Sequence, residues 1–315
     1  MPKRICILIP CYNEDLIINQ SLDELFVFLQ NLIENQLVAP SSFIAVVDDG
    51  STDATWQNIR EYHFQHPQYN LKAIRLSRNQ GHQTALLAGM LHFQPHYDCV
   101  ITLDADLQDD YRTIVEMVQL FQQNVEIVYG VRKKRKTDSF FKKYSAILFY
   151  KFMQWLGVSI IENHADFRLT SSKVVKYLEQ FKETNLFLRG IYPLLGFCSA
   201  CVYYDRLPRK QGKSKYSLAK MIAFALEGVT SLSVKPLRIV TWLGFSIFLI
   251  SIALSLYALK SYLENKVVPG WTSTVLPMYL LGGIQLLGIG IIGEYIGKIY
   301  QEVKQRPRYF IENEI

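Results

Sequence analysis

The sequence predicts an α/β domain followed by a membrane-embedded segment, and two observations indicate this. Between Lys3 and about Tyr204, short apolar runs rich in Ile and Val alternate with longer stretches of helical periodicity, which is typical of a sheet covered by helices. Further along, the runs 239–259 and 267–293 contain no charged residue. Each is longer than the roughly 20 residues that a helix needs to cross a bilayer.

The apolar runs give the expected order of elements. Strands are expected at Arg4–Ile9, Phe43–Val47, Leu71–Leu76, Cys99–Leu103 and Glu126–Tyr129. Helices are expected between them at Leu16–Glu34, Ala54–Phe64, Gln83–Leu91 and Tyr111–Gln122. Because right-handed crossovers bring the carboxyl ends of parallel strands to one edge of a sheet, the residues that follow these strands should meet there.

Polar residues do follow each of the first four expected strands. The fourth strand ends in Asp104-Ala105-Asp106-Leu107-Gln108, which presents two carboxylates and an amide. Such oxygen ligands suit Mg²⁺ or Mn²⁺ bound together with a diphosphate. An acidic helix cap is the simpler alternative for one such loop, but it does not account for four polar strand ends at one edge.

Charge and cysteine content restrict the possible partners. The net charge of +6 is modest, but basic residues cluster at 132–136 and between Arg206 and Lys220, which favours an anionic partner. The five cysteines are scattered through mostly apolar stretches, which indicates a reducing compartment. Cys198 and Cys201 have the spacing of half a zinc site or a redox pair, but no second pair accompanies them. The apolar run at the amino terminus is too short for a signal peptide.

The carboxyl-terminal third predicts attachment to a membrane. Tyr216–Val234 has the spacing of an amphipathic helix at the membrane surface, or alternatively of a helix packed on the α/β domain. We expect a domain at 1–205, a juxtamembrane segment at 206–236, two spans within 237–298 and a tail at 299–315. Basic residues flank the outer ends of the two apolar runs, so both termini should be cytoplasmic. A pair of buried core helices is the alternative to two spans. Small-residue spacing at Gly293 and Gly297 favours a homo-oligomer, with a tetramer as one candidate.

Together, these motifs identify a family resemblance. The chain resembles the polyisoprenyl-phosphate glycosyltransferases, which are inverting family 2 enzymes with a nucleotide-sugar-binding glycosyltransferase A fold. The resemblance extends over nearly the whole chain and is carried by Pro10-x-Tyr12-Asn13-Glu14, Asp48-Asp49-Gly50-Ser51-x-Asp53, Asn79-x-Gly81-x-x-x-Ala85, Asp104-Ala105-Asp106-Leu107-Gln108 and Arg206-x-x-Arg209-x-x-Gly212-x-Ser214-Lys215-Tyr216. Asp110 and Tyr111 replace two usual prolines, which should affect the start of a helix, and Ala165 replaces a usual Gly.

The resemblance implies a set of donor-binding residues. Asp48 and Asp49 would hold the nucleoside, Tyr12 would stack on it, and Asp104 would lie on the ribose or metal side. The other candidates for donor binding are Pro10, Glu14, Arg78, Gly81 and Arg132. For any one of these residues, a role in a turn or a helix cap is the alternative.

The resemblance also implies residues for the metal and the acceptor. Asp106 and Gln108 would bind Mg²⁺ or Mn²⁺. The cations Arg206, Arg209 and Lys215 would gather the acceptor phosphate and the leaving diphosphate. Asp166 would lie nearest the reaction centre, as a weak general base, as an acceptor for sugar hydroxyls or simply as a cap. We expect His82 and His164 to be structural, and Lys133–Lys136 to face the membrane.

The implied activity is transfer of a hexose, with glucose from UDP-glucose as the first candidate, to undecaprenyl phosphate at the cytoplasmic face of the inner membrane. The product would serve O-antigen or envelope modification, and nucleic acid is not an expected partner. A polyprenyl-phosphate mannose synthase using GDP-mannose is one alternative. A processive polysaccharide synthase lacks support because such enzymes resemble one another in a Gln-x-x-Arg-Trp motif and in having more spans. This chain has neither, since Gln154-Trp155 lacks the arginine. A non-enzymatic membrane scaffold or channel would leave the polar strand ends unexplained.

Overall fold

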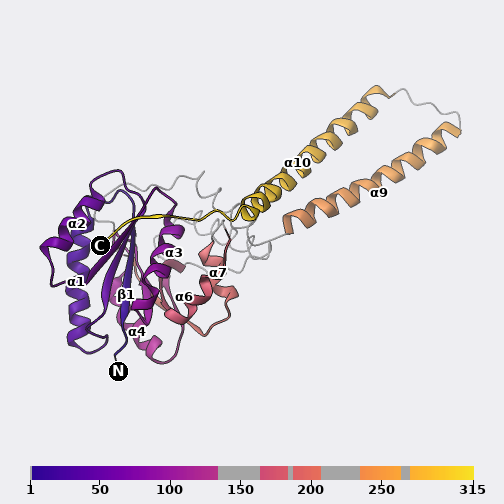
Figure 1. Ribbon diagram of the computed structural model, residues 1–315. Helices are drawn as coiled ribbons and strands as arrows, with labels where there is room; N and C mark the ends of the chain where they lie inside the picture. The colour runs from indigo at the N-terminus through magenta and orange to yellow at the C-terminus, as the bar shows by residue number, and fades with distance from the viewer. Residues whose placement is uncertain (1, 134–163, 184–186, 207–234, 264–269) are drawn as a thin grey trace. The chain divides into compact units, whose positions relative to one another are not determined.

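The computed structural model describes residues 2–133, 164–183, 187–206, 235–263 and 270–315. Among these residues, one compact unit contains the sheet, the helices around it and the carboxyl-terminal strand, and a second contains the two long helices α9 (Lys235–Leu263) and α10 (Trp271–Val303) (Figure 1). The expected helix over 216–234 lies outside the described residues.

An eight-stranded mixed sheet organises the first unit, in the order β7-β5-β6-β4-β1-β2-β3-β8. The strands are β1 (Ile5–Cys11), β2 (Phe43–Asp48), β3 (Leu71–Leu76), β4 (Cys99–Thr102), β5 (Ile127–Arg132), β6 (His164–Ser171), β7 (Ser199–Tyr204) and β8 (Ile311–Glu314). Strand β1 runs parallel to both β2 and β4, and β2 runs parallel to β3. Strand β6 is antiparallel to β4 and β5, while β5 and β7 are parallel. The five strands expected from the sequence are present.

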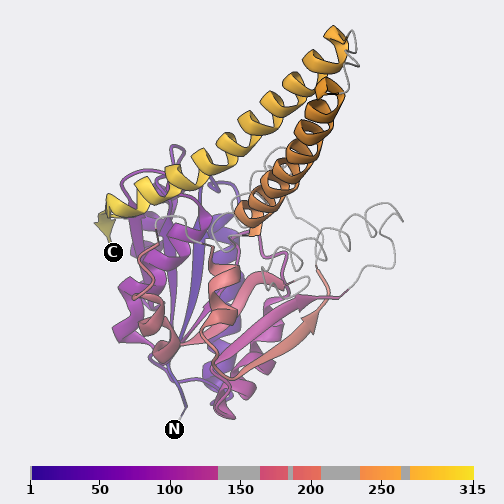
Figure 2. The ribbon, with the colours of Figure 1, turned by 90° about the vertical axis from the view of Figure 1, so that its right-hand side faces the viewer.

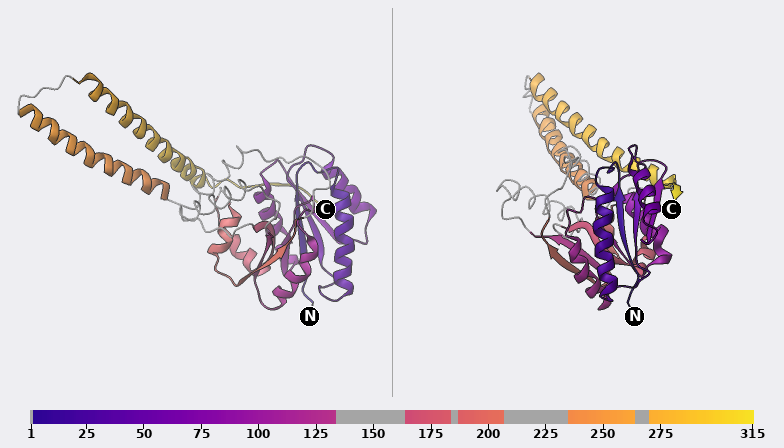
Figure 3. Two further views of the ribbon diagram at one scale, coloured as in Figure 1. Left: turned by 180° about the vertical axis from the view of Figure 1, so that it is seen from behind. Right: turned by 90° about the vertical axis from the view of Figure 1, so that its left-hand side faces the viewer.

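Helices cover both faces of this sheet, as Figures 1 and 3 show. The helices are α1 (Ile18–Glu34), α2 (Thr55–Gln65), α3 (His82–Phe93), α4 (Ile114–Gln122), α6 (Ser172–Leu178) and α7 (Leu188–Leu194), with 3-10 turns η1 (Gln94–His96) and η2 (Tyr111–Thr113). The buried side chains of α1, α2 and α4 belong to one apolar cluster, and those of α3, α6 and α7 belong to another.

Strand alternation explains why there are two clusters. In β1, Ile5, Ile7 and Ile9 belong to the first cluster, whereas Cys6 and Leu8 belong to the second. All five are fully buried, and a Leu or Ile buried in this way contributes about 1.5–3 kcal/mol to folding. The sheet is therefore apolar on both faces, which leaves its edges and strand ends as the places for polar chemistry.

Close packing fixes helix α3 on the sheet. A Cβ atom at Gly89 would lie 2.5 Å from Val47 Cγ2 and 2.6 Å from Leu8 Cδ1, so only glycine allows the helix to come this near. Because α3 begins directly after the loop that follows β3, this packing also fixes the first residue of the helix, His82, at the carboxyl edge of the parallel strands.

The chain returns to the first unit at its carboxyl end. Strand β8 pairs antiparallel with β3, and Ser77 N donates to Phe310 O at 3.0 Å. Its carboxylates contact the unit too, with Glu314 Oε1 lying 3.0 Å from His92 Nε2. The sequence Ile-Glu-Asn-Glu does not alternate apolar with polar residues, so this strand was not expected. It covers the backbone groups of an otherwise open edge.

Helices α9 and α10 run side by side in the second unit (Figures 1 and 2). A Cβ atom at Gly288 would lie 3.3 Å from Val240 Cγ1, so the glycine lies at a close contact of the two helices. Large apolar side chains on both helices are exposed, among them Trp242, Phe245 and Leu286. Within the described part of the chain, no helix combines the length and apolar character needed to cross a bilayer. The two spans expected from the sequence are therefore unconfirmed.

Candidate active site

The candidate site lies where strands β1 and β4 part. Their pairing covers Ile5–Leu8 of β1, whereas the pairing of β1 with β2 continues to Cys11. The chain passes from β1 to β2 and β3 on one side and to β4 on the other, so this is the switch point of the parallel strands. In open α/β sheets, ligands bind outside the carboxyl ends of the strands at such a point.

In the acidic loop after β4, apolar side chains point into the core and carboxylates point toward the solvent. Ala105 and Leu107 are buried in the first apolar cluster, while the intervening carboxylates of Asp104 and Asp106 are only partly buried. Ser21 of α1 donates to the Ala105 carbonyl at 2.6 Å. Leu107 has a φ of 47°, a conformation that costs of order 1–3 kcal/mol for such a residue and is found mostly at functional sites. Alternating side chains thus anchor the loop and present both carboxylates at the switch point.

The turn after β1 is tied to the turn after β2. Asn13 donates its N–H to Ser51 Oγ at 2.9 Å, and its side-chain oxygen accepts from Thr52 N at 2.9 Å. Nearby, Tyr12 is 37% exposed and can present its ring to a ligand. Pro10 is buried in β1, so it presents no comparable side-chain surface. Asn13 has a φ of 54°, which an Asn tolerates well.

Asp48 and Asp49, expected to hold the nucleoside, are buried and shape loops. Asp48 Oδ1 accepts from Ser51, and Asp48 Oδ2 lies 3.4 Å from Arg75 Nε. Asp49 accepts the N–H groups of Gln80 and Gly81 at 2.8 and 2.9 Å. Burial raises the pKa of both carboxyls, and these hydrogen bonds act against that rise. Direct contact of Asp48 or Asp49 with a nucleoside stays a prediction.

The glycine between the turn residues is required for steric reasons. Gly50 has a φ of 67°, and a Cβ atom there would lie 2.5 Å from the carbonyl carbon of Arg78 and 2.8 Å from the nitrogen of Asn79. The loops after β2 and β3 therefore touch through their backbones. Arg78 itself is exposed, and its Nε lies 2.8 Å from the side-chain amide of Gln80.

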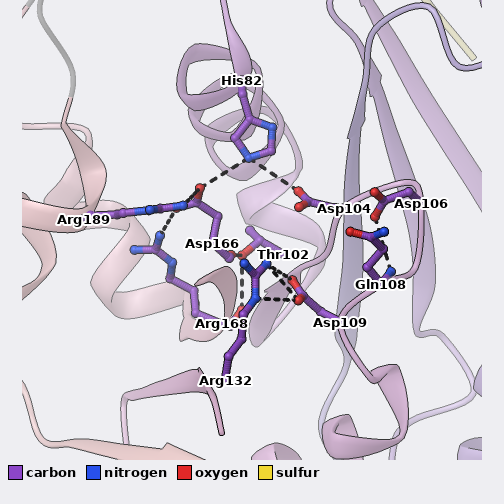
Figure 4. A network of polar contacts seen from close by, with 10 residues as sticks. All are labelled: His82, Thr102, Asp104, Asp106, Gln108, Asp109, Arg132, Asp166, Arg168 and Arg189. Atoms are coloured by element: carbon purple, nitrogen blue, oxygen red, sulfur yellow. Dashed lines mark hydrogen bonds and ion pairs between the residues drawn. The ribbon is translucent and has the colours of Figure 1, made fainter. Parts of the chain in front are cut away.

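Asp166 reaches the site because β6 runs antiparallel to β4. Thr102, the last residue of β4, pairs with Arg168, so the first residues of β6 lie beside the acidic loop. Asp166 accepts hydrogen bonds from Arg168 Nη2 at 2.6 Å and from Arg189 Nη2 at 2.8 Å (Figure 4). Burial would raise its pKa, but the contact with His82 and the charges of both arginines hold the pKa well below its usual range. The ionised form of Asp166, which accepts hydrogen bonds, is therefore favoured.

His82 and Arg189 also lie at this cluster, although the sequence interpretation gave neither a functional role. His82 was expected to be structural, but its Nε2 lies 3.6 Å from both Asp104 Oδ1 and Asp166 Oδ2. Arg189 lies on the short helix α7 and belongs to no motif. A His directly after the Asn-x-Gly element was the only sequence signal for the first, and nothing marked the second.

Two further basic candidates are held by residues of the acidic loop. Arg132, expected to bind phosphate, donates to both oxygens of Asp109 at 3.0 and 3.2 Å and to Tyr204 at 3.3 Å. Burial lowers the pKa of Arg132, but the charge of Asp109 outweighs it and raises the pKa. Arg206 donates to Gln108 Oε1. Arg209 and Lys215 lie outside the described residues.

The acidic loop fits a divalent ion that arrives with its substrate. Among the described residues, no group of three His, Cys, Asp or Glu side chains could hold a metal alone. Mg²⁺ and Mn²⁺ are commonly held by one or two carboxylates with phosphate oxygens supplying the remainder, and Asp106 with Asp104 offers that donor set. Gln108 fits less well, because its oxygen accepts a hydrogen bond from Arg206, and its role as a ligand stays a prediction.

The structure also describes Asp110 and the five cysteines. Asp110, at a position where the resemblance leads one to expect proline, accepts from Arg112 N at 3.2 Å and starts the turn η2 before α4, as expected for a change at the helix start. All five cysteines are free thiols. Cys198 and Cys201 are exposed rather than buried.

Comparison with known proteins agrees with this geometry. Residues 6–178 match the family model described as Glycosyl transferase family 2, and residues 235–299 match the one described as GtrB C-terminal hairpin. The uncharacterized glycosyltransferase YkoT of Bacillus subtilis (strain 168) is 46% identical over 308 residues, which is 98% of this chain and 91% of that protein. Bactoprenol glucosyl transferase of Shigella phage SfV is 36% identical over 317 residues, which is 99% of each chain.

A solved mannosyltransferase, PcManGT from Pyrobaculum calidifontis in complex with GDP-Man and Mn2+, matches 94% of this chain and 88% of its own at 17% identity, with a TM-score of 0.47. That score is too low to add to the assignment. The family match covers more than half of the chain, and the relatives are similar over their full length. This chain therefore belongs to glycosyl transferase family 2, and it is a glycosyltransferase whose catalytic unit has a GT-A-like α/β fold with a mixed sheet.

Proposed function

We propose that this enzyme transfers a hexose from a nucleoside diphosphate to a polyprenyl phosphate, with inversion at the anomeric carbon. The observation that carries the proposal is the cluster of charged side chains at the β1–β4 switch point, formed by Asp104, Asp106, Asp166, Arg189 and His82. The bactoprenol glucosyl transferase of phage SfV, similar over 99% of both chains, supports the polyprenyl acceptor and glucose as the first candidate sugar.

An acceptor phosphate needs positioning more than it needs a base. The second pKa of a phosphate monoester is about 6, so the acceptor is already an anion near neutral pH. The low pKa of Asp166 agrees with this, because a carboxylate held by two guanidinium groups is poorly suited to removing a proton. We propose that Asp166 accepts hydrogen bonds from sugar hydroxyls or from cations that touch the substrate. Positioning of this kind can supply much of the rate enhancement of a two-substrate reaction.

The donor lies, in this proposal, along the edge from β1 to β4. Tyr12 and Glu14 contact the nucleoside, and the loop held by Asp49 lies beside it. Asp106, with Asp104 next to it, holds Mg²⁺ or Mn²⁺ against the diphosphate. The ion, when bound, neutralises the charge that develops on the leaving diphosphate. Arg206 donates a hydrogen bond to Gln108 in the same loop. Its guanidinium group can bind a phosphate there.

Helices α9 and α10 supply, in this proposal, the contact with the bilayer that contains the acceptor. Many of the exposed side chains on these helices are large and apolar, which is unusual for a surface that faces water. Two full spans with both termini cytoplasmic are the arrangement favoured by the flanking basic residues. Labelling of cysteines introduced at 243 and 286 in sealed vesicles tests this, and rapid labelling at both positions by a water-soluble reagent would contradict it.

A donor screen tests the proposed reaction. Purified enzyme is incubated with Mn²⁺, polyprenyl phosphate and one radiolabelled donor at a time: UDP-glucose, UDP-galactose, UDP-N-acetylglucosamine or GDP-mannose. We expect label in the organic extract with UDP-glucose above the others. Label from GDP-mannose alone would replace the glucosyl assignment by a mannosyl one. Absence of extractable label from every donor would contradict the proposal and favour a scaffold.

A further inference from the structure

Residues 80–82 contact carboxylates from three strands. The backbone N–H groups of Gln80 and Gly81 donate to Asp49, which follows β2. The next residue, His82, turns its ring toward Asp104 after β4 and Asp166 in β6 (Figure 4). Residues 80–82 therefore connect the loop after β2, where the proposed nucleoside site lies, to Asp104 and Asp166, where the proposed transfer takes place.

The His82 ring lies between its two carboxylates. Nε2 is 3.6 Å from Asp104 Oδ1 and 3.6 Å from Asp166 Oδ2, and the side chain is 39% exposed. Two arginines also face this group, and Arg168 and Arg189 pair with Asp166 at 2.6 and 2.8 Å. A neutral ring has one N–H, so Nε2 can donate to only one carboxylate at a time. These distances are longer than a good hydrogen bond, and contacts in free enzymes often tighten when substrate binds.

Helix stability alone does not explain a histidine at this position. His82 is the first residue of α3, where the helix dipole disfavours a cation and favours anions. Its side chain does not cap the helix. The ring instead lies 3.6 Å from a carboxylate oxygen of Asp104 and of Asp166.

We propose that His82 is a positioning residue for glycosyl transfer, whose imidazole holds Asp104 and Asp166 at a fixed separation across the β4–β6 end of the site. The two carboxylates come from different strands, and the ring lies between them while leaving Asp104 open to substrate. The inference rests on the proposed function, because it concerns how the sugar and diphosphate are aligned. His82 acts through these carboxylates and not on the reacting atoms.

Three substitutions separate positioning from a structural role. In His82→Gln, the amide nitrogen reaches about the place of Nε2 and can still donate, whereas His82→Asn is too short and His82→Ala has no donor. We expect His82→Gln to retain most of the wild-type kcat. We expect His82→Asn and His82→Ala to lose kcat by up to about 10²-fold, the scale of a small misplacement of reacting groups. The affinity for UDP should stay at the wild-type value in all three, because Asp49 is held by backbone groups.

His92 provides a matched control on the same helix. Its Nε2 pairs with Glu314 at 3.0 Å, and we expect His92→Ala to keep the wild-type kcat. The inference is overturned if His82→Ala keeps the wild-type kcat. It is also overturned if all three His82 variants lose kcat, UDP affinity and melting temperature together, as a structural role would require. If the wild-type enzyme transfers no sugar from any donor, the proposed function fails, and this inference fails with it.

Discussion

Asp49 and Asp166 are carboxylates at the same edge of the sheet, but different kinds of group hold them. Asp49 is buried and accepts two backbone N–H groups, those of Gln80 and Gly81. Asp166 accepts from the guanidinium groups of Arg168 and Arg189. Burial raises the pKa of Asp49, whereas the cations around Asp166 overcome burial and hold its pKa well below the usual range.

This difference indicates a division of labour between the two halves of the site. In the half formed by the loops after β1, β2 and β3, Asp49 accepts backbone N–H groups and so determines the shape of loops. In the half formed by β4 and β6, Asp104 and Asp166 meet side-chain cations and remain partly exposed, so charge is available to a substrate. We expect changes in the first half to act mainly on donor binding and changes in the second half to act mainly on turnover.

The largest expected effect is that of Asp166→Asn. Arg168 is 1% exposed, and loss of its anionic partner should destabilise the folded enzyme by about 3–5 kcal/mol at neutral pH. Because the folded pKa of Asp166 is low, its stabilisation is present above about pH 4 and is lost as the pH falls through the folded pKa. Chemical unfolding at several pH values should therefore show a deficit that shrinks in acid.

Glu126→Gln is the matched control for that variant, because it removes a carboxylate from an exposed ion pair with Lys173. Its cost should be about 0–1 kcal/mol. An Asp166→Asn deficit as small as that of the control would show that the cations around Asp166 contribute no stability.

The next effect concerns the loop contact in the donor half. Gly50→Ala and Gly196→Ala place a Cβ at nearly the same φ, 67° and 68°, but only the first meets other atoms, the backbone of Arg78 and Asn79. Both should pay about 1–2 kcal/mol for the left-handed conformation, and Gly50→Ala should pay about 1–3 kcal/mol more for overpacking. Thermal unfolding measures the difference in stability between the two variants. Equal losses of stability would mean that the loops after β2 and β3 move apart at no cost. UDP affinity should fall only in Gly50→Ala.

A smaller effect is expected for Asp49→Asn. The amide can accept only one of the two backbone N–H groups, so the stability loss should be about 1–3 kcal/mol. We expect calorimetry to show weaker UDP binding, with kcat at saturating donor close to the wild-type value. A variant that loses kcat while binding UDP normally would contradict the division between the two halves.

The smallest effect is expected at the carboxyl-terminal strand. Glu314 is exposed and pairs with His92 away from the carboxyl edge of the parallel strands. Glu314→Gln should cost about 0–1 kcal/mol. Its kcat and UDP affinity should match those of the wild type, and a clear loss of either would show that this strand influences the site.

The sequence predicted the first five strands of the fold well because each has a local signal. Strands β1 to β5 are apolar runs, and Ala105 and Leu107 alternate with carboxylates in a pattern that could be read directly. The polar strand ends were expected to meet because parallel strands share an edge, and their loops are joined by the contacts Asn13–Ser51, Asp49–Gly81 and His82–Asp104.

The partners of those residues could not be predicted because they come from distant segments. Arg189 meets Asp166 from a seven-residue helix that has no motif. His82 was interpreted as structural because no nucleophile is near it in the sequence, whereas its partners lie after β4 and in β6. Strand β8 has no apolar alternation, since backbone pairing with β3 determines it. Burial of Asp48 and Asp49 likewise depends on loops that come together only in the folded unit.

Transfer of radiolabelled glucose from UDP-glucose to polyprenyl phosphate, measured with Mn²⁺ and again after chelation, tests the central claim most directly. The wild-type enzyme and Asp110→Asn, which alters only the turn before α4, should both label the lipid, and the chelator should abolish the label reversibly. Asp106→Ala should give no label while unfolding at the wild-type temperature. Full transfer by Asp106→Ala, or transfer that is unaffected by chelation, would contradict a metal-bound donor at the end of β4.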